Sequence, residues 1–597
     1  MKRGRIIRRA LEIALVALIV VLGASLVLRS HTPASRFAAF APDDEKRITE
    51  AAWTGVAGGG GSLSEAATGE EVVAIVVAFH SLVVNPKSPP MAAAVPGDDA
   101  AKTAAELAKS LRASVPPQQV VSTVSIHAIT DPRRIRIAEF AKRGWTFERG
   151  LDALMLCEDG ECRAIPAVVQ HARSMSFESA RQSLHKGRGV EVLGLKLDDG
   201  LYRTRESAWL SNGPGQDVVP LFRASSTVPR VTSDDILRAC RIGGDFLIKI
   251  QQPNGKWYYG YDAGKDDLDK VDYNLLRHAG TTYSMYQLYD VTREPRYLDA
   301  ANAGLRWQRT VIEADPADPE RLFVREPHNI KLGGAGLALM AYVEKRKVAG
   351  WDGEDERVAA GLARHCLLSQ KDDGSFRDYH GIPGVNAKTR RSIYYPGEAM
   401  LGLIRYHQIV PERSDILDAV RRAADHLIDN RWTIMGMRFN VPPDAWLMLA
   451  LEELHEADPN PKYADHCFRM ARGMEFEQLG PRWGLDHAGG YYPAPPQVTP
   501  AGSRSEGLTA AWLLAKRLGD EHTADEIRET VLRSARFQVE RVIRPDFVTL
   551  YPSPPRALGV FRHSPVSNAM RIDYNQHNIS GLLIAARMTA EDNVPQP

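Results

Sequence analysis

Between residues 234 and 590 the chain repeats one pattern six times, and this repetition constrains the fold more than any other feature of the sequence. Each repeat is a loop with Gly, Pro, Asn or an aromatic residue, followed by small and apolar residues at helical spacing. The repeats begin near residues 278–281, 332–336, 395–399, 443–446, 505–508 and 576–580. Between them lie amphipathic segments at residues 239–251, 300–311, 358–370, 419–430, 467–477 and 531–542. The pattern predicts twelve helices in six pairs.

Six helix pairs suit a ring in which the small-residue helices stand inside, because crowding at the centre favours Gly and Ala. This organisation resembles the (α/α)6 toroid superfamily, which includes six-hairpin glycosidases, glucuronyl epimerases and terpenoid-cyclase-like proteins. Residues 251–257 and 370–376 resemble the Q-x-x-x-G-x-W turn that follows outer helices in terpenoid cyclases, and residues 574–578 are similar to a segment of the epimerases. The resemblance implies the fold of residues 234–590 and leaves the chemistry open.

The N-terminus has the pattern of a membrane anchor. Five basic residues precede an apolar run, residues 10–28, in which Glu12 is the only charge. We expect residues 1–30 to be a signal anchor that crosses a bacterial-type inner membrane once, with the bulk of the chain periplasmic or extracellular. A cleaved signal peptide is the alternative, but residues 26–29 fit a cleavage site poorly.

Two further regions separate the anchor from the repeats. Residues 31–70, rich in Ala, Pro and Ser and containing four consecutive glycines, are expected to be a flexible tether. Residues 71–223 are expected to form a smaller α+β domain, because β-branched strand-like segments alternate there with helical ones. Residues 151–165 predict a hairpin whose Cys157 and Cys162 face each other, either as a disulfide or as two half-buried thiols.

The expected fold is therefore mainly α. Residues 149–166 are faintly similar to an AMMECR-type domain, and the α+β domain would gate a cleft, contact the envelope or bind a protein partner that the sequence does not identify. The 75 basic and 74 acidic residues leave a net charge of +1, which argues against nucleic acid as a partner. No cofactor is predicted, and no metal, since the five cysteines lack the spacing of a metal site.

The candidate site lies where loops meet the first turns of the inner helices, which would face one shared cavity. Carboxyl and imidazole groups there would exchange protons, and aromatic rings would stack on sugars. The candidate catalytic residues are Glu398, Glu506, Asp444, His278 and His577. The candidate substrate-binding residues are Tyr394, Tyr395, Trp446, Arg277, Arg504, Arg571, Asp573 and Tyr491, and Asn274 and Gln576 are expected in the same cavity.

Each of these residues also has a purely structural interpretation. Acidic groups in helix first turns complement the helix dipole by ~0.3–1 kcal/mol, and histidines and tyrosines often serve only in packing. Arg277, Arg504 and Arg571 occupy comparable places in three repeats and would suit an acidic sugar such as a uronate. Alternatively, they pair with the acids near them in sequence, which are Asp272, Glu506 and Asp573.

The sequence thus favours a carbohydrate-active enzyme, a glycoside hydrolase, lyase or sugar epimerase, whose substrate is an envelope or secreted polysaccharide. Glu398 and Glu506 are the predicted acid and base. A non-catalytic glycan- or protein-binding scaffold and a terpenoid-cyclase-like enzyme are the alternatives. The cyclase needs a D-x-D-D cluster, whose nearest match, residues 266–269, lies in a polar loop. Zinc-dependent toroids are disfavoured because the three remaining cysteines fall on outer helices.

Overall fold

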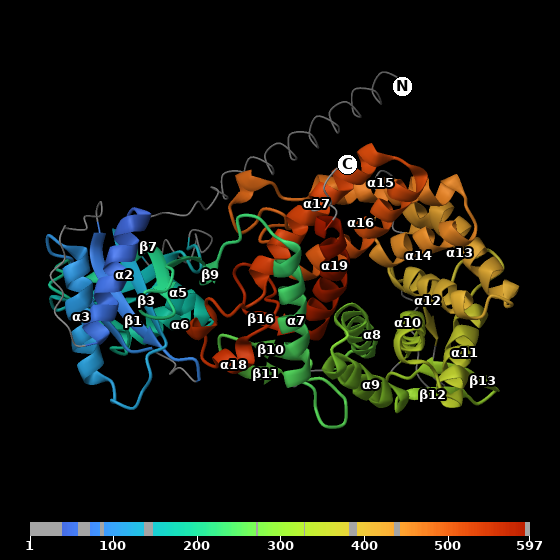
Figure 1. Cartoon of the computed structure of the whole chain (residues 1–597), viewed down its shortest axis with the longest axis horizontal. Coiled ribbons are helices and arrows are strands. Elements are labelled where there is room, and N and C mark those ends of the chain that lie inside the picture. The colour runs from blue at the N-terminus through green and yellow to red at the C-terminus, as the bar shows by residue number, and fades with distance from the viewer. Residues whose placement is uncertain are drawn as a thin grey trace, which may run out of the picture.

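A computed structural model of the chain describes residues 39–57, 72–83, 89–136, 147–269, 273–327, 329–380, 391–434 and 442–590. Figure 1 shows a strand-rich part, in blue and teal, beside a larger ring of helices that runs from green to red. The predicted anchor at residues 10–28 lies outside the described residues. Among the helices that are described, none has both the length and the apolarity needed to cross a membrane.

The strand-rich part is built around a closed barrel of seven strands. Their order is β3-β1-β2-β6-β5-β4-β7, and β3 also pairs with β7, which closes the sheet; β8 and β9 extend it beyond β7. Only the pairing of β2 with β6 is parallel. The strands are β1 (Val72–His80), β2 (Met91–Ala94), β3 (Thr123–Arg134), β4 (Asp152–Glu158), β5 (Glu161–Ile165), β6 (Val190–Leu193), β7 (Gly200–Ser211), β8 (Val219–Phe222) and β9 (Ser225–Ser226). The α+β prediction is confirmed, and closure is the feature it lacked.

The predicted hairpin and its cysteine pair are both present. Strands β4 and β5 are antiparallel neighbours in which Cys157 lies opposite Cys162, and the two form a disulfide. Among the described residues, four helices accompany the barrel: α2 (Pro42–Val56), α3 (Ala100–Ser114), α5 (Ala167–Ala172) and α6 (Phe177–His185).

Helix α2 corrects the prediction of a flexible tether over residues 31–70. It packs against α3 and the barrel, where Trp53 Nε1 donates to Ser211 Oγ over 3.2 Å and Trp209 Nε1 donates to Thr49 Oγ1 over 2.9 Å. A proline at its first position and three acidic residues in its first turn are standard helix-start signals. Residues 31–38 and 58–70 of the predicted tether lie outside the described residues.

The helical part is the predicted ring of six pairs. Each inner helix packs against the next, and the last returns to the first, which closes an (α/α)6 toroid. The inner helices are α8 (Leu275–Thr292), α10 (Leu332–Ala349), α12 (Tyr395–Ile409), α14 (Ala445–Ala457), α16 (Val498–Leu518) and α19 (Ile572–Ala590). The outer helices are α7 (Ser233–Lys249), α9 (Pro295–Arg309), α11 (Gly353–Leu368), α13 (Ser414–Ile434), α15 (Pro461–Glu477) and α17 (Glu521–Arg541).

Short elements decorate the ends of the ring. They are β10 (Gly260–Asp262), β11 (Asp267–Asp269), β12 (Ile312–Asp315), β13 (Asp318–Val324), β14 (Ile330–Lys331), β15 (Tyr379–His380), β16 (Ala569–Arg571) and α18 (Pro554–Ala557), with two 3-10 turns, Pro481–Trp483 and Val548–Leu550. Buried Cys240, Cys366 and Cys467 lie on outer helices, as expected.

The two turns at residues 251–257 and 370–376 connect neighbouring helix pairs through hydrogen bonds. Gln251 donates to the carbonyl of Ala300 over 2.9 Å, and Gln370 donates in the same way to Ala419 over 2.8 Å. Gly255 has φ +92°, and a Cβ there would lie 2.0 Å from the carbonyl oxygen of Ala303. The motif therefore needs glycine for both backbone conformation and close approach to the next outer helix.

One predicted helix start is wrong in a way that affects the site. The sequence placed the start of the fifth inner helix near residue 505, whereas α16 begins at Val498. Arg504 and Glu506 therefore lie beyond the first turn, where the helix dipole has little effect on a carboxyl group.

Candidate active site

A cavity of about 390 Å³ opens at the N-terminal ends of the inner helices. It is lined by Asn274, Leu276, Arg277, Leu337, Ser392, Tyr394, Tyr395, Glu398, Pro443, Ala445, Trp446, Met474, Thr499, Ser503, Arg504, Arg571, Asp573, Gln576 and His577. Nine of the thirteen predicted site residues are among them. The other four, Glu506, Asp444, His278 and Tyr491, do not line it.

Glu398 is a carboxyl group of the cavity whose pKa is strongly raised. It lies in the first turn of α12 and is 5% exposed, and its Oε2 atom has no hydrogen-bond partner among the described residues. Burial, with a smaller contribution from the charge of Asp444, raises the pKa of Glu398 to about 8. The carboxyl group is therefore mostly protonated at neutral pH, which is the state that a general acid requires.

The negative charge of Asp444 contributes to the raised pKa of Glu398. It is fully buried as the N-cap of α14, where its Oδ1 accepts a hydrogen bond from Leu447 N over 3.2 Å. The sequence predicts a catalytic role for Asp444; the structure places it at the N-cap of α14, outside the cavity lining, where its charge helps to raise the pKa of Glu398. The opposite wall is Gly333 of α10, where a Cβ would fall 1.9 Å from Glu398 Oε2.

His577 and Glu506 form a buried pair at the other side of the cavity. His577 Nδ1 lies 2.7 Å from Glu506 Oε2, and only His577 lines the cavity. Burial raises the pKa of Glu506. For His577, burial disfavours the charge, but the carboxylate of Glu506 outweighs it, so the pKa of His577 is raised. With Nδ1 committed to Glu506, Nε2 is the nitrogen left for a substrate.

Glu506, predicted from the sequence as a catalytic acid or base, therefore lies behind His577 and not in the cavity lining. The carboxyl group is 2% exposed and reaches the cavity only through the imidazole, so it is not itself placed to touch a substrate. It fixes the tautomer and raises the basicity of His577, which is the usual work of a carboxylate behind a histidine.

Three arginines converge on the cavity, and carboxylates hold each of them. Arg571 grips Asp573 with Nε at 2.5 Å and Nη2 at 2.8 Å, and Arg277 Nε approaches the same carboxylate at 3.3 Å. Arg504 pairs with Glu477 at 2.6 Å, and the predicted Arg504–Glu506 pairing is wrong. Because Arg277 and Arg571 share one carboxylate, this wall keeps an excess positive charge.

Aromatic rings complete the wall. Tyr394 is 47% exposed at the mouth, and Tyr395 packs against Tyr379 with ring centroids 5.4 Å apart. Trp446 lies beside the imidazole of His577 with ring centroids 5.7 Å apart. These flat surfaces beside hydrogen-bonding groups are what sugar faces stack against.

His278 and Tyr491, both predicted site residues, are buried behind the cavity and do not line it. His278 is fully buried, with Nδ1 2.7 Å from the hydroxyl of Tyr273 and Nε2 donating to the carbonyl of Gly304 over 2.8 Å. Burial lowers its pKa to about 3, so it stays neutral. Tyr491 is buried beneath Arg504, whose guanidinium lies 5.0 Å from the ring centroid. Both residues support the cavity walls without reaching the cavity.

Several lining residues were missed by the sequence reasoning. Thr499 and Ser503 belong to the first turns of α16, which the sequence started too late, and Ser392 lies just before α12. Met474 comes from outer helix α15, which no argument about inner helices would have included. The small polar residues at helix starts were the signal that could have found the first three.

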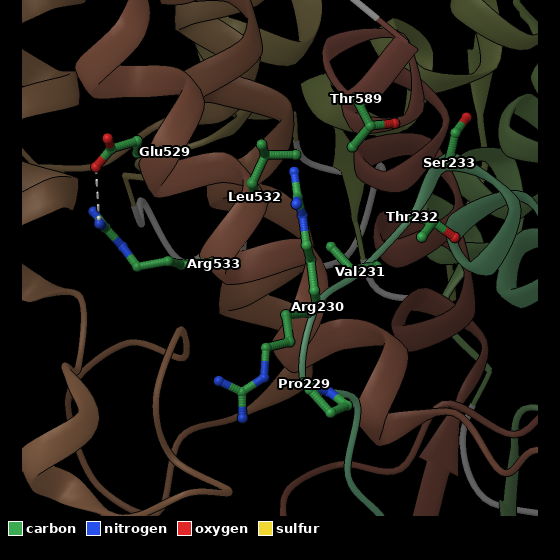
Figure 2. A pocket seen from close by; sticks show the side chains of 10 residues that line it. Pro229, Arg230, Val231, Thr232, Ser233, Glu529, Leu532, Arg533 and Thr589 are labelled. Carbon is green, nitrogen blue, oxygen red and sulfur yellow. Dashed lines mark hydrogen bonds and ion pairs between the residues drawn. The ribbon is translucent and has the colours of Figure 1, made fainter. Parts of the chain in front are cut away.

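A second cavity, of about 610 Å³, lies on the outside of the ring (Figure 2). It is lined by residues 229–233, by one face of α17 and by Thr589. Its one carboxylate, Glu529, is paired with Arg533 at 3.4 Å, as the dashed line in Figure 2 shows. It is larger than the central cavity but brings no proton donor and acceptor together, so the chemistry points to the centre of the ring.

Comparison with known proteins finds distant likenesses to solved structures. No protein-family model and no curated protein sequence matches the chain. The chain is similar to an inactive variant of an alpha-1,6-mannanase of Salegentibacter sp. HEL1_6 in complex with alpha-1,6-mannotriose, at 12% identity and a TM-score of 0.42, over 59% of this chain and 99% of that one. It is also similar to a D-mannose isomerase, at 13% identity and 0.45, over 60% and 97%.

A third similar structure is the cellobiose 2-epimerase of Bacillus thermoamylovorans B4167, at 10% identity and a TM-score of 0.44, over 59% of this chain and 99% of that one. Likeness this distant carries no argument about chemistry, and the toroid is established by the closed contact ring of its inner helices. The faint AMMECR-type resemblance of residues 149–166 gains no support.

Proposed function

We propose that this protein is a carbohydrate-active enzyme that uses acid/base chemistry in the central cavity. Its substrate is an envelope or secreted polysaccharide, with uronate-containing polymers favoured by the excess positive charge at Arg277 and Arg571. The observation that carries the proposal is Glu398, a buried carboxyl group in a sugar-sized cavity whose pKa of about 8 keeps it protonated at neutral pH.

The roles follow from the environment of each group. Glu398 donates a proton to the departing or rearranging oxygen of the sugar, as a carboxyl group with a raised pKa does in glycoside chemistry. His577 accepts a proton at Nε2, and the carboxylate of Glu506 stabilises the imidazolium that forms. Tyr394 and Trp446 offer faces on which sugar rings stack. Hydrolysis, elimination and epimerisation all use this donor and acceptor.

The proposal includes a location. The basic N-terminus followed by the apolar run at residues 10–28 supports an anchor in the inner membrane, with the cavity on the periplasmic or extracellular side. An envelope or secreted polysaccharide is the substrate class that such a position would meet.

The test is a screen of the full chain against acidic and neutral envelope polysaccharides in D2O, with products detected by mass. New reducing ends indicate hydrolysis, unsaturated sugars indicate elimination, and deuterium at sugar carbons without cleavage indicates epimerisation. Glu398→Gln is the matched control, and it should abolish turnover while leaving the melting temperature at pH 6 within a few degrees. Binding without chemical change in the wild type would contradict the enzyme and support a glycan-binding scaffold.

A further inference from the structure

We infer that the barrel braces the central cavity by holding the two segments that position Arg571 and Arg504. The inference rests on the proposed function in taking this cavity as the working site, but its test needs no substrate. Figure 1 shows α5 and β9 of the barrel on the side that faces the ring, near α18 and β16. Two sets of contacts cross this boundary and lead to cavity arginines.

The first set holds strand β16. This strand ends at Arg571 and pairs with β10, with Gly260 opposite Arg571 and Asp262 opposite Ala569. At the end away from the cavity, Asn568 Nδ2 donates to the carbonyl of His171 over 2.5 Å. There too, Ser174 Oγ donates to Asp262 Oδ1 over 2.6 Å. Both strands are thus bonded to the barrel close to Arg571. On β16 the bonded residue, Asn568, is three residues before Arg571, and on β10 the bonded residue, Asp262, is two residues after Gly260, which lies opposite Arg571.

The second set holds the connection between α15 and α16. Arg223 of the barrel pairs with Asp486 of this connection, Nε to Oδ2, at 2.7 Å, and both side chains are less than 10% exposed. The same connection supplies Tyr491, whose ring lies under Arg504, and it begins beside Glu477, which pairs with Arg504 at 2.6 Å. Removing either partner of a buried ion pair leaves an uncompensated charge, so this contact fixes the path of the connection.

The barrel core in turn fixes the residues that make the first set. Glu206 Oε1 accepts hydrogen bonds from His127 Nδ1 at 2.8 Å and from the backbone of Val168 at 3.2 Å. Val168 lies in α5, which contains His171 and ends at Ala172, two residues before Ser174. Glu206, His127, Val168 and His171 are buried and Ser174 is half-buried, and α5 also packs in the apolar core of the ring. A continuous path of contacts therefore runs from the barrel interior to β16.

Arg223, Ser174 and Asn568 are accordingly positioning residues. None of them lines the cavity. Asn568 and Ser174 hold the paired strands β16 and β10 beside Arg571, and Arg223 holds the connection that supplies Tyr491, which packs against Arg504. The barrel thus helps to fix the positions of Arg571 and Arg504. Without it, these positions would depend only on β16 and on the connection between α15 and α16.

The test is hydrogen–deuterium exchange of the full chain, comparing Asn568→Ala, Arg223→Ala and Arg223→Lys with the wild type. Asn568→Ala should speed exchange at residues 569–571 roughly tenfold, and Arg223→Ala should do the same at residues 486–492, because local opening becomes easier. Arg223→Lys should restore much of the protection. Asn212→Ala is the matched control, since its amide donates to Asp546 O over 2.9 Å across the same boundary but leads to neither segment.

Unchanged exchange in both segments would overturn the inference. Exchange that rises evenly over the whole chain would also overturn it, because that is a general loss of stability and not a local release. If the local effects appear but no polysaccharide is turned over, the brace stands and the proposed function fails. The two ideas are therefore separable.

Discussion

At the scale of single residues, burial and neighbouring charges shift the pKa values of the titratable groups in and around the cavity. Glu398 is buried beside the negative Asp444 and holds its proton up to a pKa of about 8. His577 is buried beside Glu506 and has a raised pKa, whereas His278, buried among aromatic rings, has a pKa of about 3.

The raised pKa of Glu398 predicts how stability changes with pH. The folded state binds this proton more tightly than the unfolded state, so stability is lost as pH rises from about 4.5 towards 8. The loss due to this group should reach about 4 kcal/mol, at ~1.36 kcal/mol per pKa unit. Denaturant unfolding at pH 5 and pH 8 should therefore show a smaller drop for Glu398→Gln than for the wild type. Equal drops in the two proteins would contradict the assignment.

The His577–Glu506 pair predicts the shape of the pH–activity profile. The base works only above the raised pKa of His577, and the acid only below about 8, so activity should peak in a narrow range on the alkaline side of pH 6.5. Glu506→Gln removes the charge that raises the pKa of His577. Measured on the substrate found by the screen, the acid limb should move to lower pH and the maximal rate should fall ~10-fold or more. An unmoved acid limb would exclude this pairing as its origin.

At the scale of elements, the inner helices approach so closely that glycines determine where the proposed catalytic groups lie. Helix α10 places Gly333 directly against Glu398, whereas its neighbour Gly334 has no atom closer than 3.4 Å to an added Cβ. The contact between α10 and α12 therefore leaves room for the Glu398 side chain only because residue 333 is a glycine.

Gly333→Ala should disable the site, and Gly334→Ala should not. The new methyl group at residue 333 would fall 1.9 Å from Glu398 Oε2 and 2.7 Å from Tyr395 Cδ1, so the carboxyl group must move. We expect a loss of ~1–3 kcal/mol in the free energy of unfolding and nearly complete loss of turnover for Gly333→Ala. Gly334→Ala should keep both close to wild type. Unfolding curves and turnover of the two variants, measured together, check the prediction, and equal behaviour would refute it.

Most of the helical architecture could be predicted from the sequence, because the pattern repeats six times and an error in one helix boundary does not change the number of helix pairs. Six loop–helix signatures were enough to predict the closed ring, although the start of α16 was misplaced. The site was harder: His278 and His577 occupy similar positions in their repeats, and only tertiary packing makes one structural and the other part of the cavity. The reach of Glu506 through His577, and Met474 from an outer helix, depend on contacts that no local pattern encodes.

At the scale of the whole molecule, the barrel and the ring share a continuous interior. One apolar cluster contains Val168, Ala172, Leu210 and Leu221 of the barrel together with the cores of the helices. Arg562 of the ring, 1% exposed, donates to Ser225 of β9 and to the carbonyl of Glu540. Buried polar groups at this boundary would lose their partners if the two parts separated.

This shared interior predicts one cooperative unfolding transition. Separating the barrel from the ring would break the hydrogen bond from Arg562 to Ser225 and the buried Arg223–Asp486 ion pair. Neither part on its own offers new partners that would offset this loss of free energy. Scanning calorimetry of the full chain should therefore show a single peak, with calorimetric and van't Hoff enthalpies in agreement. Two resolved peaks, with the barrel melting apart from the ring, would contradict it.

The protonation state of Glu398 at neutral pH is the claim on which the proposed chemistry depends, and infrared spectroscopy can measure it without a substrate. The difference spectrum between the wild type and Glu398→Gln should contain the band of one protonated carboxyl group. Titrated from pH 5 to pH 9, that band should disappear with a midpoint near 8. A band already absent at pH 6 would mean that Glu398 is an ordinary ionised carboxylate and would contradict its assignment as the general acid.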